Sequence, residues 1–218
     1  SVSFDGFKKS LLAHAATGVY FDLSILSKCP QKLRAAAFAD VICRTTAQVD
    51  WLMSNMILNT LYDETPYILL GLYEDEMIKK AKKIKEGEIT SLALLTRISA
   101  IMGLGTFFTG TTHLGSMAEH GISHYIDMFA NSLHPGTSHG EQVGIATLTV
   151  SKIQNSILNN DKPPTMYPTT IPKKDIIKEL GESTMDLIKQ EMKVKTFNSK
   201  KIEDINNYLE NNWNDFVE

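Results

Sequence analysis

The chain has 218 residues and a formal net charge of −3 at pH 7, with 22 lysines and arginines against 25 aspartates and glutamates. Hydrophobic residues make up 43% of the sequence, which is too apolar for a disordered chain and sufficient for a substantial core. This charge balance gives no general attraction to nucleic acid or to an anionic membrane. Cys29 and Cys43 form no CxxC pair, so we expect neither a disulfide framework nor a Cys-rich zinc site. We expect a reducing, cytoplasmic location.

The first residues contain the clearest β-strand pattern. Val2–Phe4 and Phe7–Leu11 flank Asp5-Gly6, a dipeptide that supplies the positive φ angles of a two-residue hairpin turn. A short apolar run at 18–21 suggests a further extended segment. No secretory signal pattern is visible at this end of the sequence.

From Pro30 onward the periodicity is helical. Pro30 suits a first helical position, and the residues that recur at helical spacing after it are Leu33, Ala36, Ala37, Asp40, Arg44 and Ala47. Further helices are expected at 67–85, 89–108, 116–131, 138–159, 173–191 and 201–216. We therefore predict a mainly α fold preceded by a short β-hairpin.

The most apolar stretch, 89–110, is long enough to span a bilayer. Arg97 lies inside it and serines and threonines interrupt it, so a helix buried on most sides within the protein is the preferred interpretation. Residues 160–172 form the one clear loop, before a terminal helical pair. The sequence has no strand–GxGxxG–helix unit and no Walker loop, so no dinucleotide site is recognisable in it.

Five of the six histidines fall between residues 113 and 139. His120 and His124 are four residues apart on a predicted helix and therefore share a face. The segment EHGISH is not HExxH, because Glu119 precedes the first histidine, so a zinc protease is not indicated. His139 follows Pro135-Gly136 and stands where a loop meets a helix.

Catalytic zinc and ferrous sites commonly have three protein ligands and one open position. His120 and His139 would therefore need a third ligand, and Asp40, in the apolar run AAAFADVIC, is the natural candidate. A carboxylate buried in such a run needs a cation to neutralise it. The alternative is that Asp40 faces solvent or pairs with Arg44, one turn later.

These segments resemble a known family. GSMAEHGISHYIDMF and SHGEQVGIATL resemble the metal-binding helices of the iron-containing alcohol dehydrogenase and dehydroquinate synthase-like superfamily, and within it the sn-glycerol-1-phosphate dehydrogenase family. Residues 4–51 resemble that family's hairpin and aspartate-bearing helix. The resemblance implies the family's C-terminal helical domain, with Asp40, His120 and His139 as ligands of zinc, iron or nickel. It places His124 at a further active-site histidine, suited to relaying a proton.

The resemblance also implies a domain division. We expect a β-hairpin and extended segment at 1–26, a metal-binding helical domain at 27–160 and a helical tail at 161–218. The family's N-terminal Rossmann-like NAD(P) domain would lie outside this chain, either as a separate domain or as a subunit. We expect an exposed apolar face where the two would meet, and a homo-oligomer.

The implied function is the metal-binding half of an oxidoreductase of phospholipid metabolism that reduces dihydroxyacetone phosphate to sn-glycerol 1-phosphate with NAD(P)H. Two alternatives are a non-catalytic metal-binding or interaction remnant and a glycerol (polyol) dehydrogenase of the same superfamily. The partner is then a small molecule, either dihydroxyacetone phosphate or a glycerol-like alcohol, with no nucleic acid and no membrane. The family's GSSRPASG loop starts here at Gly110 and has His113 in place of an arginine, which weakens the case for a phosphate site.

Overall fold

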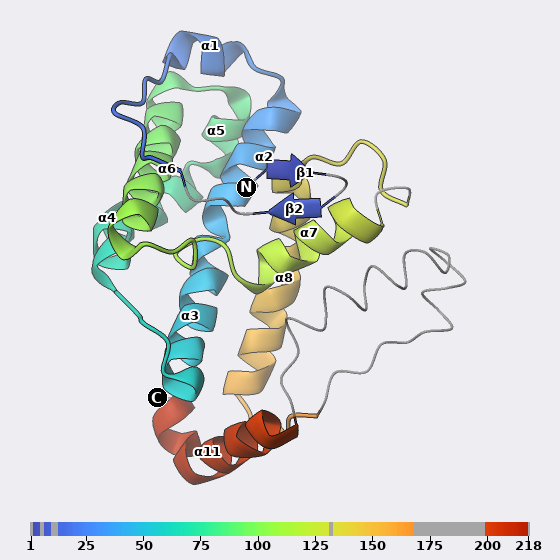
Figure 1. Cartoon of the computed structure of the whole chain (residues 1–218). Helices are drawn as coiled ribbons and strands as arrows, with labels where there is room; N and C mark the ends of the chain where they lie inside the picture. The colour runs from blue at the N-terminus through green and yellow to red at the C-terminus, as the bar shows by residue number, and fades with distance from the viewer. Residues whose placement is uncertain (1, 5–6, 10–12, 131–132, 168–198, 218) are drawn as a thin grey trace.

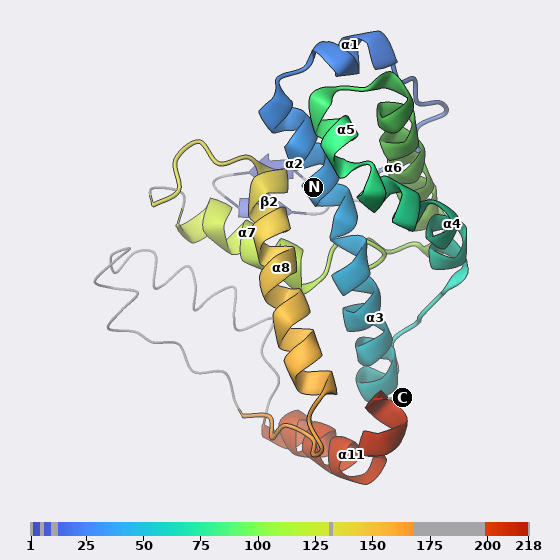
Figure 2. The same cartoon turned by 180° about the vertical axis from the view of Figure 1, so that it is seen from behind.

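The computed structural model describes residues 2–4, 7–9, 13–130, 133–167 and 199–217 (Figure 1). Two consecutive helices, α2 (Gln31–Ile42) and α3 (Arg44–Leu58), run through the middle of the molecule. A third, α8 (His139–Leu158), lies alongside both of them, as the view from behind also shows (Figure 2). The predicted mainly α fold is confirmed for the described residues.

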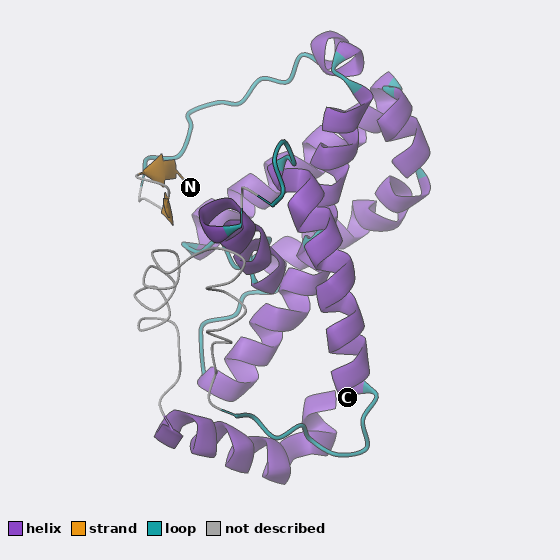
Figure 3. Cartoon of the chain, turned by 90° about the vertical axis from the view of Figure 1, so that its right-hand side faces the viewer, coloured by secondary structure: helices purple, strands orange, loops and turns teal. Residues whose placement is uncertain are grey.

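The remaining helices cover this central unit on three sides. On one side of α2 lie α1 (Leu23–Lys28), α4 (Thr65–Lys79), α5 (Ala81–Glu86) and α6 (Ile89–Thr109). On the other side α7 (Ala118–Phe129) packs against α8. The last helix, α11 (Ser199–Val217), is kinked at Asn212 and closes the ends of α3 and α8 (Figure 3).

Two short strands precede the helices. Strand β1 (Val2–Phe4) pairs antiparallel with β2 (Phe7–Lys9), and Phe4 stands opposite Phe7 in the register. The turn predicted at 5–6 lies outside the described residues, as does the helix predicted at 173–191. The apolar run at 18–21 forms no strand.

Several predicted helices have the expected bounds, but two are divided. Helices α6, α7, α8 and α11 begin and end within two residues of the prediction. The single helix predicted from Pro30 to Ala47 is wrong, because α2 ends and α3 begins at Cys43. The Cys43 thiol and the Thr45 and Thr46 hydroxyls donate to the carbonyls of Asp40, Ile42 and Cys43, respectively, and such back-bonding bends helices. The helix predicted at 67–85 is divided at Lys80, and α1 was not predicted.

The main core lies between α2, α3 and the α4–α6 group. Trp51 is fully buried near its centre, and its indole Nε1–H donates to the Leu61 carbonyl at 2.7 Å. Tyr67 lies beside it, with ring centroids 6.1 Å apart, and donates its hydroxyl to the Leu114 carbonyl at 3.0 Å. The indole and the phenol are thus buried with their polar atoms satisfied, as stable cores require.

Helix α6 is only partly the buried helix that its composition predicts. It is the one helix in the described part of the chain that is long and apolar enough to cross a membrane. Its first half packs into the core through Leu92, Leu95 and Ile98. Its second half exposes Phe107 (61%) and Phe108 (77%), so the expectation of burial on most sides is wrong there.

A close approach of two backbones joins α2 to α8. A Cβ atom on Gly140 would stand 2.2 Å from the Ala36 carbonyl oxygen, and one on Gly144 would stand 2.7 Å from the Ala39 Cβ. Only small residues allow helices to pass this closely. The contact sets the positions of Asp40 on α2 and His139 on α8, which lie next to these small residues.

We expect Gly140→Ala to destabilise the fold. The added methyl group meets backbone that cannot rotate away, and overpacking of this kind costs about 1–3 kcal/mol. The matched control is Gly71→Ala on α4, where a Cβ meets nothing within 4 Å and the substitution should stabilise the helix by about 0.5–1 kcal/mol. Urea denaturation of both variants measures the difference, and equal stabilities would contradict the close α2–α8 contact.

Candidate metal centre

Three helices bring Asp40, His120 and His139 together. Asp40 is near the end of α2, His120 is in the first turn of α7, and His139 is the first residue of α8. One nitrogen or oxygen atom of each lies within 4.8 Å of those of the other two. The Nε2 atoms of His120 and His139 lie 3.7 and 3.6 Å from Asp40 Oδ1, respectively. The structure therefore places together the three residues proposed as ligands from the sequence.

The starts of α7 and α8 position the two histidines. At α8, the backbone N–H and the hydroxyl of Ser138 both donate to the Glu141 carboxylate, at 2.8 and 2.9 Å, in the S-x-x-E pattern of a capping box. At α7, the N–H of Met117 donates to Glu119 Oε1 at 2.8 Å, and the N–H of Ala118 donates to Asp50 Oδ2 at 3.1 Å. Each histidine thus follows a hydrogen-bonded helix start.

The arrangement suits a divalent cation. Asp40 Oδ1 is buried and has no hydrogen-bond partner, which is costly for a carboxylate oxygen. One oxygen and two imidazole nitrogens form a donor set that zinc, iron and nickel all accept. The alternative partner for Asp40 is engaged elsewhere, because the buried Arg44 contacts the carboxylate of Glu74. The residues present therefore fit a bound metal ion.

Glu119 contacts the ring nitrogen of His120 that does not face Asp40. It is fully buried, and its Oε1 lies 3.0 Å from His120 Nδ1. Burial by itself would raise the pKa of Glu119, but hydrogen bonds from His120 and from the Met117 N–H outweigh it and lower the pKa below 4.5. The carboxyl group is therefore ionised at neutral pH. This role was not predicted from the sequence, although Glu119 directly precedes His120.

A second set of polar side chains supports His139. The Ser123 hydroxyl lies 2.9 Å from His139 Nδ1 and donates to Gln142 Oε1 at 2.8 Å. Gln142 Nε2 in turn donates to Asp127 Oδ1 at 2.9 Å. Ser123 and Gln142 are both buried, and neither was predicted from the sequence. Their helical spacing, one turn after His120 and one turn after His139, is the signal that could have found them.

Cys43 also lies close to the centre. Its thiol, Glu119 and His120 form a second group whose potential ligand atoms lie within 4.8 Å of one another. Burial, with smaller contributions from the charges of Glu119 and Asp40, raises the pKa of the Cys43 thiol far above 9.0. A thiol that keeps its proton is a poor ligand, and this one donates to the carbonyls of Asp40 and Gly115 at 2.8 and 3.2 Å. The Cys43 thiol therefore has a structural role, as a hydrogen-bond donor, and is not a candidate metal ligand.

His124 borders the centre without being part of the three-residue group. Its ring centroid lies 6.2 Å from that of His120 and 6.1 Å from that of His139. His113 lies with its ring 5.9 Å from that of Trp51. Of these two histidines, His124 is the one whose ring adjoins both candidate histidine ligands.

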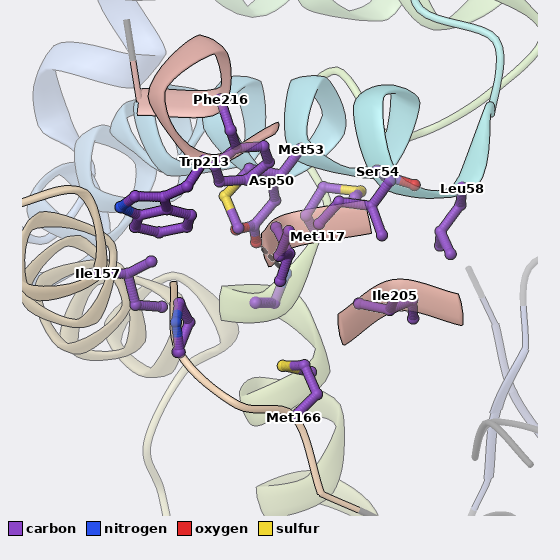
Figure 4. Close-up of a pocket in the computed structure, with 14 residues that line it drawn as sticks. Asp50, Met53, Ser54, Leu58, Met117, Ile157, Met166, Ile205, Trp213 and Phe216 are labelled. Carbon is purple, nitrogen blue, oxygen red and sulfur yellow. Dashed lines mark hydrogen bonds between the residues drawn. The ribbon is translucent and has the colours of Figure 1, made fainter. Parts of the chain in front are cut away.

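An apolar cavity of about 530 Å³ lies between α3, α8 and α11 (Figure 4). Met53, Met117 and Trp213 are among the side chains that line it. Its polar groups among the described residues are already engaged: Asp50 accepts from Gln154 at 2.7 Å and from Ala118, and Ser54 bonds Thr60 at 3.0 Å. The cavity therefore presents no set of convergent polar groups for chemistry.

Comparison with known proteins identifies relatives. The chain is 34% identical over 139 residues to a glycerol-1-phosphate dehydrogenase of Methanothermobacter thermautotrophicus, covering 64% of the chain and 39% of the relative. It is 29% identical over 150 residues to the enzyme of that name from Halalkalibacterium halodurans, covering 68% and 38%. It is 27% identical over 162 residues to the enzyme of that name from Methanosphaera stadtmanae, covering 74% of the chain and 46% of the relative. All three names specify NAD(P)+.

These matches confirm the resemblance to the glycerol-1-phosphate dehydrogenase family. The matched part of the chain spans about two fifths of the length of these relatives. No family model matches the chain. No solved structure matches it either.

We expect Asp50→Ala to lower the free energy of unfolding by about 1–3 kcal/mol, because it leaves the Ala118 N–H at the start of α7 without its acceptor. Asp75→Ala, an exposed position on α4, is the control and should change stability by less than about 0.5 kcal/mol.

The contribution of Asp50 to the free energy of unfolding should also depend on pH. Burial raises the pKa of Asp50 above 3.8, against the hydrogen bonds from Gln154 and Ala118 that lower it. The folded state then binds the proton more tightly than the unfolded state, so the contribution of Asp50 is largest below 3.8 and declines as pH rises through the folded pKa. Denaturing wild type and Asp50→Ala from below pH 3.8 up to neutral pH measures this contribution as the difference between their free energies of unfolding. A difference that grows as the pH rises would contradict the raised pKa of Asp50.

Proposed function

We propose that this chain is the metal-binding half of an NAD(P)-dependent, glycerol-1-phosphate dehydrogenase-like oxidoreductase that reduces dihydroxyacetone phosphate to sn-glycerol 1-phosphate. The observation that carries the proposal is the convergence of Asp40, His120 and His139 from three helices, in a chain whose relatives bear that name. The cofactor-binding part is a Rossmann-like domain or subunit outside the described residues. The proposed location is cytoplasmic.

Asp40, His120 and His139 would hold the metal ion, and Asp40 would supply negative charge that partly neutralises it. When bound, a zinc, iron or nickel ion supplies Lewis-acid polarisation of the substrate carbonyl. NAD(P)H would supply the hydride for the carbonyl carbon, and the carbonyl oxygen would need a proton. His124, whose ring adjoins both histidine ligands, is the proposed donor of that proton through a ring N–H.

A second candidate is a polyol dehydrogenase that acts on glycerol-like alcohols. The observation in its favour is His113, which stands where the family has an arginine and lies beside Trp51. An imidazole gives a phosphate less positive charge and fewer donors than a guanidinium does. Comparing kcat/KM for dihydroxyacetone and its phosphate, in protein that includes the nucleotide domain, distinguishes the candidates. A preference for the phosphate supports the first proposal, and binding of metal without turnover of either substrate supports a non-catalytic remnant.

The nucleotide-binding domain has a suitable surface to pack against. A wide groove of about 1200 Å³ runs between residues 13–21 and the second half of α6, where Leu104, Phe107 and Phe108 are exposed. Exposed apolar area of this kind marks an interaction site. The relatives are more than twice as long as the segment they share with this chain, so they contain a further part that could cover such a face. We propose that the groove receives the nucleotide domain.

The chain by itself should then associate through this face. We expect its elution volume in gel filtration to shift toward larger species as concentration rises, and Phe107→Lys with Phe108→Lys to reduce the shift. Lys82→Glu, at an exposed position on α5, is a control that changes charge but leaves the groove intact. A monomer at every concentration would contradict this surface.

Metal content tests the centre directly. We expect about one equivalent of a divalent transition metal in tag-free protein, measured by mass spectrometry, because three neutral or anionic donors converge. Asp40→Asn and His139→Ala should each lose it. His134→Ala, at an exposed position in the loop before α8, should keep it. No bound metal after reconstitution would refute the metal centre.

A further inference from the structure

We infer that Ser123 and Gln142 are positioning residues that hold His139 in the tautomer with its proton on Nδ1, so that the lone pair of Nε2 faces Asp40. The inference deepens the proposed metal centre, and it rests on that proposal only for its effect on metal binding. The tautomer itself is a property of the metal-free protein.

The orientation of the Gln142 amide is set by its neighbours. Its Nε2 lies 2.9 Å from Asp127 Oδ1 and 3.1 Å from Thr137 Oγ1. A carboxylate only accepts, and the Thr137 hydroxyl already donates to the His134 carbonyl at 3.0 Å. Both positions therefore call for the amide N–H groups, and Oε1 must face the other way, toward Ser123.

The Ser123 hydroxyl has one proton, and its direction follows. Gln142 Oε1, at 2.8 Å, is an acceptor without a proton, so Ser123 must donate to it. The Ser123 oxygen then has only lone pairs left for His139 Nδ1, at 2.9 Å. His139 Nδ1 must therefore carry the proton and donate it to Ser123.

The unprotonated nitrogen of His139 is thus Nε2. This atom lies 3.6 Å from Asp40 Oδ1, on the side of the ring that faces the other two donors. His120 has the same arrangement through a different partner, because the carboxylate of Glu119 accepts from its Nδ1 at 3.0 Å and leaves Nε2 facing Asp40 at 3.7 Å. Two lone pairs and a carboxylate oxygen then face one another with no proton between them.

The two supports differ in charge. Glu119 gives His120 an ionised acceptor, whereas His139 is held by a neutral hydroxyl that is itself held by a neutral amide. Removing Ser123 therefore removes no charge near the centre, so its effect reports orientation and tautomer alone. Partners of this kind typically change metal affinity by about 10–100-fold.

The test measures the tautomer without metal. The purified, metal-free protein is labelled with ¹⁵N-histidine, and the ring nitrogens are observed by long-range ¹H–¹⁵N correlation at about pH 8, above the ordinary histidine pKa. The spectrum of His139→Ala assigns the His139 signals by their loss. We expect His139 to be protonated on Nδ1 in the wild type, and Ser123→Ala and Gln142→Ala to shift it toward the Nε2-protonated form.

The control is Thr147→Val on α8, which removes a buried hydroxyl bonded only locally, to the Val143 carbonyl at 2.8 Å. It should leave the His139 tautomer unchanged. A wild-type His139 protonated on Nε2, or a tautomer that Ser123→Ala does not alter, would overturn the inference.

Metal titration completes the test. Ser123→Ala should bind zinc or cobalt about 10–100-fold more weakly than wild type, and Thr147→Val should bind as wild type does. If the wild type shows the Nδ1–H tautomer but binds no metal, the proposed centre fails and the positioning role stands. If Ser123→Ala changes the tautomer but not the affinity, the consequence for metal binding is refuted.

Discussion

The close packing of α2 against α8 at Gly140 and Gly144 is the constraint on which the candidate centre depends. Asp40 and His139 are almost one hundred residues apart in sequence, and they meet because glycine lets the two backbones approach to a distance that any side chain would prevent. Helix α7 then packs across α8 and adds His120 and Ser123. A larger residue at the crossing would separate the donors as well as the helices.

Buried polar groups make this crossing specific. Glu119, Ser123 and Gln142 lie in the interior, where each would be costly without partners, and the hydrogen bonds that satisfy them are the ones that orient His120 and His139. Asp40 Oδ1 stands out against this background, because it alone among the side-chain atoms of the three candidate ligands is buried without a hydrogen bond. The same network therefore stabilises the helix packing and leaves one place where a cation would be favourable.

Many of the large apolar side chains pack into two clusters, but Leu104, Phe107 and Phe108 on the second half of α6 are exposed. One group of apolar residues surrounds Trp51, a second joins α11 to α3 and α8, and the second half of α6 remains uncovered. The relatives are much longer than the matched segment. We propose that this uncovered face packs against the further part that the longer relatives contain.

The sequence by itself determined the mainly helical class and the bounds of α6, α7, α8 and α11, and it pointed to the three candidate donor residues, because helical periodicity and motifs such as EHGISH and SHGEQVG are local patterns. Only the tertiary structure decided what those residues contact. The division at Cys43, the pairing of Arg44 with Glu74, and the supports behind His120 and His139 all involve side-chain hydrogen bonds and packing, many of them between distant segments. Which segments meet depends on how closely α2 and α8 pack, and helical periodicity alone does not determine that distance.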